Sequence, residues 1–302
     1  MAEGKSQFEV FLAEQIEKYR GVAFPVYTPW LWRKLVRKVN PKILHPNPED
    51  EFCDPRIGPN YGIISKYERE YEAAKRDHTR DILTETLTVE RMKPDGYLLL
   101  NGHHRWAAAL RQNVRRVPIE IVNVTHVIDI QKMLQNTHND KRVVMDLDEV
   151  VLAAPGDTQV EKALPFPMNL SYRRRLRLGV PALFSFFKGR GYDIWVYSSK
   201  YYSLNRIKRL FLLHGVTIDG IVTGVKRGKL HRGRDREKIH ELIANQYPRT
   251  VNIDGNSVVF IDSRTKMFEE YTLSGAPENW SREVMDAFEQ HKKQEKSEAK
   301  SL

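Results

Sequence analysis

The chain has 302 residues, of which 41% are hydrophobic and 29% are charged, and its formal net charge at pH 7 is +10. This length allows two domains of ordinary size, and the composition is typical of a soluble protein with hydrophobic cores. The single cysteine, Cys53, excludes an internal disulfide and a cysteine-based zinc cluster. No segment approaches the roughly 20 apolar residues of a membrane helix, and the N-terminus lacks the pattern of a secretory signal. We therefore expect a cytoplasmic protein with no membrane partner.

The basic charge is concentrated in one part of the chain. Between Leu170 and Lys238 there are 17 Lys and Arg residues but only 4 Asp and Glu. Such a segment attracts phosphate-rich partners, whether nucleotides or nucleic acid. DNA or RNA is therefore one candidate partner of residues 173–238, and a set of solvated basic helix faces is the other interpretation.

The first part of the chain combines short helical patterns with a hairpin. Apolar residues at helical spacing predict helices over 8–19, 30–39 and 63–75. Two β-prone runs, 86–91 and 97–100, flank the turn Lys93-Pro94-Asp95-Gly96, which predicts a β-hairpin. A further strand is expected over 117–122. Residues 124–139 fit either a helix or a strand, and they end in a polar connector that we take as the domain boundary.

A strand-to-helix turn with a glycine follows the predicted hairpin, in Asn101-Gly102-His103-His104-Arg105. A helix N-terminus presents free N–H groups and the positive end of a dipole, and both favour an anion. Arg105 and one or both histidines would add donors and charge. The turn therefore predicts a phosphate cradle, and the alternative is a helix start at which the histidines only pack.

The same residues resemble a known family. The segment DGYLLLNGHHRWAAA at 95–109, with DPRIGP at 54–59 and VPI at 117–119, is similar to the signature of the ParB/sulfiredoxin-like fold, a small α+β domain. The resemblance implies that ATP or another nucleotide binds here. The residues that it assigns to the nucleotide are Gly102, His104 and Arg105, with His103 at the position of the reactive cysteine of sulfiredoxins.

The superfamily includes kinases, nucleotidases and DNA-binding proteins, so the resemblance implies a kinase-like or nucleotidase role as one option. Its kinase-type members use an acidic residue from an upstream loop. Four residues of this chain are candidates for that acid, and the choice among them stays open: Glu49, Asp50, Glu51 and Asp54.

A second chemical signal lies in residues 142–151, where a run of apolar, β-prone residues ends in Asp146 and Asp148. The run predicts a buried parallel strand, and residues i and i+2 of a strand point the same way. Open α/β sheets bind ligands at the carboxyl ends of their strands. Two adjacent carboxylates repel unless a cation compensates, and Mg²⁺ is the simplest candidate. An ordinary strand followed by an Asp-rich loop is the alternative.

The rest of the chain predicts parallel βαβ units, because strands expected over 193–197, 218–223 and 257–261 alternate with helical patterns. These helical patterns cover 172–189, 204–213 and 237–245. A polar group follows each strand, namely Ser198, the basic loop from Lys226 to Arg236, and Asp262. We expect these groups to share one site at the carboxyl edge of the sheet.

This order of motifs resembles the haloacid dehalogenase superfamily of phosphotransferases. Asp146-Leu147-Asp148-Glu149-Val150 matches the first motif, Ser198 the second, a lysine of the basic loop the third, and 258–262 the fourth. Lys229 is preferred over Lys226 for the third, because it lies nearer the following helix. The resemblance implies a Rossmann-like three-layer α/β/α domain with a parallel sheet, and the short intervals between motifs leave room for only a minimal cap.

The resemblance also implies the chemistry of an Mg²⁺-dependent phosphatase. Asp146 would attack phosphorus, Asp148 would act as acid and base, Ser198 would bind the phosphoryl group, and Lys229 would balance its charge. Mg²⁺ would be held by Asp146, the backbone carbonyl of Asp148, and Asp262. The chain departs from the family pattern at Glu149, where many members have glycine. It also lacks an evident second acid beside Asp262, since Glu269 is the nearest.

Together these signals predict an α/β protein with a nucleotide-binding domain at 1–134, a phosphatase-like domain at 135–290, and a charged disordered tail at 291–302. The function that they favour is an Mg²⁺-dependent phosphomonoesterase coupled to a nucleotide-binding or kinase-like domain. Its substrate would be a phosphorylated small molecule, such as a nucleotide, or a nucleic-acid end. The alternative is a non-catalytic DNA-binding or regulatory protein that uses both folds as binding modules.

Overall fold

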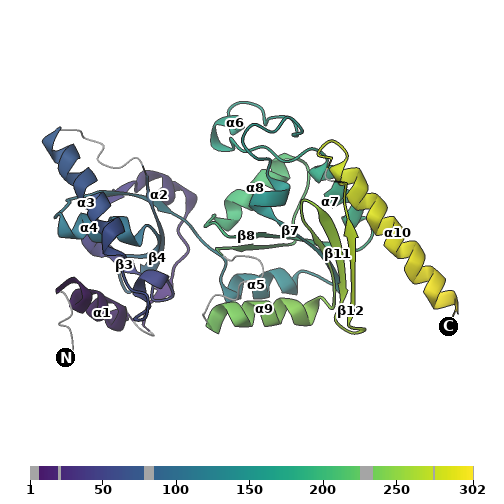
Figure 1. Ribbon diagram of the computed structural model, residues 1–302, viewed down its shortest axis with the longest axis horizontal. Helices are drawn as coiled ribbons and strands as arrows, with labels where there is room; N and C mark the ends of the chain where they lie inside the picture. The colour runs from purple at the N-terminus through teal and green to yellow at the C-terminus, as the bar shows by residue number, and fades with distance from the viewer. Residues whose placement is uncertain (1–6, 20–21, 78–84, 225–233, 275, 302) are drawn as a thin grey trace. The chain divides into compact units, whose positions relative to one another are not determined.

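The computed structural model describes residues 7–19, 22–77, 85–224, 234–274 and 276–301 (Figure 1). They form two compact units, Met1–Asn123 and Val124–Leu302, each with its own β-sheet and hydrophobic core. The protein therefore has a mixed α/β fold with two sheets.

The boundary between the units lies earlier than the sequence predicted. Helix α5 (Val127–Gln135) was placed before the boundary at 134/135, but its Ile130 and Met133 are buried in the core of the second unit. The division therefore falls after Asn123.

The sheet of the first unit has the strand order β2-β6-β4-β5-β3, and β1 pairs with β4. The neighbours β4 and β5 are antiparallel, which confirms the predicted hairpin. The strands are β1 (Phe24–Pro25), β2 (Lys38–Val39), β3 (Leu44–Pro46), β4 (Leu87–Lys93), β5 (Tyr97–Asn101) and β6 (Val117–Ile121).

The helices of the first unit surround a core that is centred on α4. Trp106 of α4 is fully buried, and its indole N–H donates to the carbonyl of Pro41 at 2.9 Å. The helices are α1 (Gln7–Tyr19), α2 (Trp30–Leu35), α3 (Tyr61–Arg76) and α4 (His103–Arg111), with short 3₁₀ turns η1 (Pro41–Ile43) and η2 (Glu51–Cys53). The helix predicted over 30–39 ends at Leu35, because Lys38 and Val39 instead pair with β6.

The sheet of the second unit has the strand order β12-β11-β10-β7-β8-β9. Strands β10, β7, β8 and β9 are parallel, whereas β11 and β12 run antiparallel to their neighbours. The strands are β7 (Lys141–Asp146), β8 (Asp193–Ser198), β9 (Gly220–Thr223), β10 (Arg249–Ile253), β11 (Ser257–Asp262) and β12 (Met267–Thr272).

Helices cover both faces of this sheet, with α5 and α9 on one face and α7 and α8 on the other (Figure 1). Helix α10 packs against α7 and β11. The helices other than α5 are α6 (Met168–Ser171), α7 (Val180–Lys188), α8 (Leu204–Leu213), α9 (Arg234–Gln246) and α10 (Trp280–Ser301), with the single turn η3 (Leu147–Val151) after β7.

Two sequence expectations for the second unit are wrong. The helix expected over 172–189 begins only at Val180, and the chain before it is extended, with bridges from Leu176 to Leu152 and from Arg177 to Val160. Gly179, at φ +84°, caps the start of α7 and separates the two parts. The tail predicted to be disordered from residue 291 is helical as far as the structure describes it, because α10 continues to Ser301.

Candidate active site and nucleotide site

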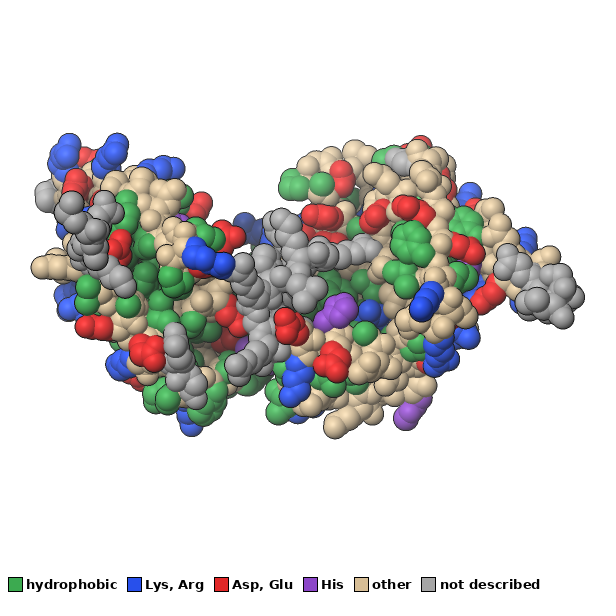
Figure 2. Space-filling model, turned by 60° about the horizontal axis from the view of Figure 1, so that its bottom comes forward, with side chains coloured by type: hydrophobic (Ala, Val, Ile, Leu, Met, Phe, Trp, Pro, Cys, Tyr) green, Lys and Arg blue, Asp and Glu red, His purple; other side chains and the backbone are tan. Residues whose placement is uncertain are grey.

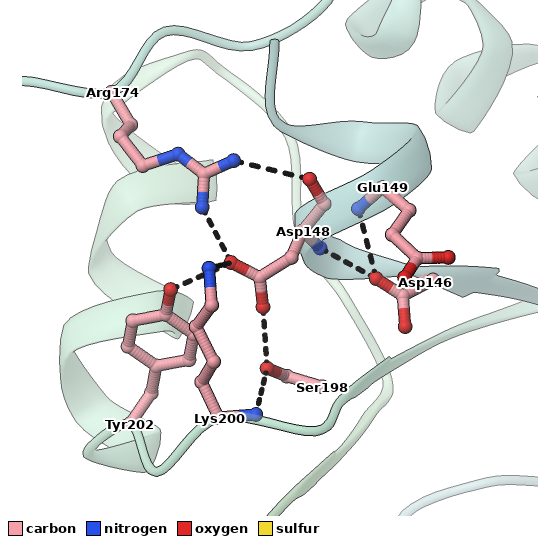
Figure 3. A network of polar contacts seen from close by, with 7 residues as sticks. All are labelled: Asp146, Asp148, Glu149, Arg174, Ser198, Lys200 and Tyr202. Atoms are coloured by element: carbon pink, nitrogen blue, oxygen red, sulfur yellow. Dashed lines mark hydrogen bonds and ion pairs between the residues drawn. The ribbon is translucent and has the colours of Figure 1, made fainter. Parts of the chain in front are cut away.

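The carboxyl end of β7 carries a single helical turn that is capped by Asp146. Oδ1 of Asp146 accepts the backbone N–H groups of Asp148 and Glu149, at 2.7 and 2.9 Å (Figure 3). These two bonds satisfy donors that a helix start leaves unpaired, so they fix the carboxylate in place. Among the residues drawn in Figure 3, none forms a hydrogen bond or ion pair with Oδ2 of Asp146.

Asp148 accepts hydrogen bonds from four side chains (Figure 3). Ser198 Oγ donates to Oδ2 at 2.6 Å. Tyr202 Oη and Lys200 Nζ donate to Oδ1, at 2.7 and 3.0 Å. Arg174 also donates to Oδ1, and its second nitrogen donates to the backbone carbonyl of Asp148 at 3.1 Å.

These donors determine the charge state of Asp148. Burial by itself raises the pKa of the carboxyl, but hydrogen bonds from Ser198, Tyr202, Lys200 and Arg174 outweigh burial, and the pKa lies below its ordinary value. In Tyr202, burial and then the bond to Asp148 raise the pKa to about 12. At neutral pH, Asp148 is therefore an ionised acceptor and Tyr202 a protonated donor.

The parallel pairing of β7 with β8 brings Asp146, Asp148 and Ser198 together. Asp146 pairs with Tyr197, so Ser198 is the next residue at the carboxyl end of the adjoining strand. Ser198 is fully buried, as expected for the floor of a site. The sequence predicted this grouping of two aspartates and a serine, and the structure assembles it.

Asp262 lies at the amino ends of the parallel strands, opposite to the end that carries Asp146. Because β11 is antiparallel to β10, Asp262 pairs with Arg249, which in turn pairs with Lys141, the first residue of β7. Its Oδ2 is 3.3 Å from Nε of Arg249, and its Oδ1 accepts the N–H of Arg264 at 2.8 Å. The expectation that Asp262 shares a metal ion with Asp146 and Asp148 is therefore corrected. No three His, Cys, Asp or Glu side chains of the described residues are grouped as a metal site.

A third aspartate, Asp254, lies at the carboxyl ends of the parallel strands, near Asp146, and was not predicted from the sequence. Ile253 of β10 pairs with Met145 of β7 in parallel register, so Asp254 and Asp146 are the next residues on neighbouring strands. Oδ1 of Asp254 accepts the N–H groups of Asn256 and Ser257, at 2.9 and 2.7 Å, in the turn to β11. The signal available in the sequence was the turn Asp-Gly-Asn after a short β-branched run.

Other residues of the site had weaker signals. Arg174 was hidden within a basic run, and nothing in the sequence distinguished Tyr202. Lys226 and Lys229, the two candidates for the phosphate-binding lysine, lie outside the described residues.

In the first unit, Gly102, His103 and His104 form the N-terminal turn of α4. Gly102 has φ +98°, and an added Cβ would lie 2.5 Å from Leu87, so glycine is required there. His103 Nε2 accepts the N–H of Asn47, and His104 Nε2 accepts the N–H of Asn60, both at 3.1 Å. The histidines thus hold two loops against the helix.

The expectation that these histidines add positive charge is not met by this geometry. An imidazole nitrogen that accepts a hydrogen bond carries no proton. Burial lowers the pKa of His103 to about 4, and burial likewise lowers the pKa of His104. Arg105 therefore supplies the positive charge at this turn. It is buried and forms an ion pair with Glu85 at 3.1 Å.

A cavity of about 260 Å³ opens at this helix start. It is lined by Asn101, Gly102, both histidines, Arg105, Ile63, Tyr67 and Asp50. Of the four acids proposed from the sequence, Asp50 is the one that lines the cavity, and its carboxylate is 3.5 Å from Nδ1 of His103. Asp54 instead pairs with Arg56 at 2.9 Å.

Comparisons with known proteins give little further information. No protein-family model matches the chain, and no curated protein matches it. One similar solved structure is the C-terminally truncated chromosome-partitioning protein ParB from Caulobacter crescentus, complexed with CTP-gamma-S. The match has 22% sequence identity and a TM-score of 0.23, and it covers 34% of this chain and 55% of that chain. A TM-score this low does not establish a shared fold.

Proposed function

We propose that the second unit is a phosphomonoesterase that works through an aspartyl-phosphate on Asp146. The observation that carries the proposal is the convergence of Asp146, Asp148 and Ser198 at the carboxyl ends of two adjoining parallel strands. A haloacid dehalogenase-like unit with helices on both faces of the sheet fits this arrangement. The alternative, a non-catalytic binding module, leaves the assembled carboxylates and hydroxyl without a role.

The proposed chemistry has two steps. In the first, Oδ2 of Asp146 attacks phosphorus while the bond to the leaving oxygen breaks, and Asp148 gives that oxygen a proton, which the carboxylate must first take up from solvent when the substrate binds. In the second, Asp148 takes a proton from water, whose oxygen attacks phosphorus, so that inorganic phosphate leaves and Asp146 is restored. Ser198 would release its hydrogen bond to Asp148 and donate to the phosphoryl group, and Lys229 would balance its charge.

Magnesium fits this site through two carboxylates rather than through the predicted set. Asp146 and Asp254 lie at adjoining strand ends, and Mg²⁺ often uses one or two carboxylates with waters and phosphate oxygens. Each carboxylate that now caps a turn keeps further lone pairs for an ion. A bound ion would neutralise charge that develops on the phosphoryl oxygens.

The test is phosphate release from an aryl phosphate, with Mg²⁺ and with a chelator. We expect metal-dependent release by the parent protein and a loss of at least roughly 10³-fold in Asp146→Asn. Glu149→Gln is the matched control, because this neighbouring carboxylate is exposed and only its backbone contacts Asp146. Release that survives in Asp146→Asn would exclude the aspartyl-phosphate route.

For the first unit we propose that the cavity at the start of α4 binds ATP or another nucleotide. The supporting observations are the free helix N-terminus, the glycine at φ +98°, and the buried charge of Arg105 beside the cavity. A kinase-like or nucleotidase activity would need an acid, and Asp50 is the one in position.

Calorimetric titration with ATP, ADP and CTP tests this site. We expect Arg105→Ala to weaken binding of the preferred nucleotide, with thermal unfolding as the control for folding. Equal affinity in the two proteins would count against the cradle. Asp50→Asn then separates binding from chemistry, because it should spare affinity and remove any phosphate transfer.

We also propose nucleic acid as a partner of the basic segment 173–238. We propose that the protein is cytoplasmic. In the view that brings α5 and α9 forward, acidic and basic side chains are interspersed (Figure 2). Among the described residues, no helix is long and apolar enough to cross a membrane.

A further inference from the structure

We infer that Arg174 and Lys200 form a second anion subsite, which holds a phosphate group carried by the leaving group of the substrate. The inference rests on the proposed function, and it adds a substrate class to it. The class is phosphomonoesters whose leaving group bears another phosphate. Both a nucleoside bisphosphate and a phosphorylated nucleic-acid end have this chemistry.

The two cations converge on one atom from different segments of the chain. Arg174 and Lys200 both donate to Oδ1 of Asp148, whereas Ser198 holds Oδ2 (Figure 3). Asp148 is the group that would protonate the leaving oxygen. Groups that surround its Oδ1 therefore line the path of the leaving group rather than the pocket of the transferred phosphoryl.

The depth of these side chains supports this placement. Ser198 is fully buried, the side chain of Asp148 is 9% exposed, that of Arg174 is 35% exposed, and that of Lys200 is 61% exposed. The cations thus lie between the floor of the site and solvent. Only the carboxylate end of the lysine–carboxylate pair is buried, so the ammonium group of Lys200 is accessible to a ligand from solvent.

The backbone on both sides of the subsite is fixed. Next to Arg174, the carbonyl of Arg175 accepts the N–H of Ala153, and Arg177 donates its N–H to Val151, both at 2.9 Å. The N–H of Lys200 donates to Ser198 Oγ at 3.0 Å. In this proposal the side chains of Arg174 and Lys200 rotate from Asp148 to the ligand, while these hydrogen bonds hold the backbone in place.

Charge favours an anion at this wall of the site. Arg174 and Lys200 both form ion pairs with Asp148, whereas Lys188 and Arg190 pair with acids elsewhere in the unit. Without a ligand, the two cations balance Asp146 and Asp148. A phosphorylated substrate adds negative charge beside these carboxylates, and cations that turn toward it relieve the repulsion. The guanidinium fork of Arg174 matches a phosphate, which it can bind through two nitrogens.

The experiment compares three substrates in the full chain: an aryl phosphate, adenosine 3′,5′-bisphosphate, and an oligonucleotide with a terminal phosphate. The variants are R174Q, K200Q and the double variant, with K293Q as the control for the loss of one positive charge. Lys293 is exposed on α10 and lies outside the site and outside the basic segment 173–238. Thermal unfolding checks that each variant is folded, and R174K tests whether a retained charge restores part of the effect.

We expect the double variant to lower kcat/KM for the bisphosphate or the oligonucleotide at least roughly 10-fold more than for the aryl phosphate, mainly through KM. K293Q should match the parent. A preference for one of the two phosphorylated substrates identifies the source of the second phosphate.

An equal loss for all three substrates, or no loss for any, would overturn the inference while the phosphatase proposal stands. No phosphate release from any substrate by the parent protein would instead overturn the phosphatase proposal, and the subsite with it.

Discussion

At the scale of single residues, Asp254 lies at the carboxyl ends of the parallel strands and Asp262 at their amino ends. Asp254 ends the parallel strand β10 beside Asp146, and Asp262 ends the antiparallel strand β11 beside Arg249. Chemistry at the carboxyl edge can therefore use Asp254 and not Asp262. The two aspartates form a matched pair for mutation, because each follows a strand of the same sheet.

We predict that Asp254→Asn lowers phosphate release at least roughly 10-fold and raises the Mg²⁺ concentration needed for half-maximal rate. Asp262→Asn should leave that Mg²⁺ dependence unchanged. It should instead lower the free energy of unfolding by about 1–2 kcal/mol, because it weakens the pairing with Arg249 and the cap on Arg264. Magnesium titrations of the rate, together with urea unfolding, separate the two effects. The reverse pattern would show that the register argument is wrong.

His103 gives the first unit a predicted pH dependence. Its pKa is about 4 in the folded state, against an ordinary value of 6.5, because burial disfavours the protonated ring. The unfolded chain therefore takes up the proton first. Stability is complete above pH 6.5 and falls as the pH drops toward 4, by up to about 1.4 kcal/mol per pH unit for this histidine.

His103→Gln tests this prediction, since glutamine can still accept the N–H of Asn47 but does not titrate. We expect urea unfolding of the first unit to depend less on pH in the variant than in the parent between about pH 6.5 and pH 4. Part of the dependence should stay, because burial also lowers the pKa of His45 to about 4. Identical pH profiles would contradict the account of His103.

At the scale of elements, the second half of α10 packs on β11 and β12 through His291. Its ring is 3% exposed and stacks on Phe260 at a centroid distance of 3.8 Å, and its Nδ1 is 2.9 Å from Glu269. These contacts extend the packed face that Trp280, Val284, Ala287 and Phe288 form earlier in the helix. A composition rule for disorder overlooks such contacts, because they join residues that only the fold brings together.

We predict that His291→Ala lowers the free energy of unfolding of the second unit by about 1–3 kcal/mol. Lys293→Ala is the control, because Lys293 is exposed on the same helix. Its change should stay within about 0.5 kcal/mol. Thermal unfolding monitored by circular dichroism measures both. Equal effects would mean that α10 does not depend on this contact.

The elements that the sequence predicted well are those with one dominant local signal. The hairpin of β4 and β5 has a turn between two apolar runs, and β7 and β8 are continuous apolar runs. Strand β10 was missed because five residues with polar Arg249 and Asn252 show no clear pattern. Residues 249–253 form a strand because they pair with β7 and β11. Because this strand was missed, Asp262 was placed at the carboxyl ends of the parallel strands, where Asp254 lies.

The same limit applies to the site. Asp146, Asp148 and Ser198 could be grouped from sequence, because parallel strands bring their carboxyl ends to one edge. The contacts of Arg174 and Tyr202 with Asp148 depend on where the chain returns after the site, which local patterns do not encode. For His103 and His104, the sequence identified the right turn but not the two backbone donors that keep their acceptor nitrogens occupied.

At the scale of the whole molecule, the chain combines two units with separate sheets and cores. Each unit should therefore unfold as its own cooperative transition. We predict two transitions in calorimetry of the full chain. A nucleotide that binds the first unit should raise only one of them, and Mg²⁺ with inorganic phosphate should raise only the other. A single transition that both ligands shift together would contradict this organisation.

The central claim is that Asp146 becomes phosphorylated during turnover. The most direct measurement is mass spectrometry of peptides from Asp148→Asn after acid quenching with substrate, since loss of the base should slow hydrolysis of the intermediate. We predict one phosphate, carried by Asp146. Phosphate on Ser198, or no phosphorylated peptide while substrate is turned over, would contradict the account.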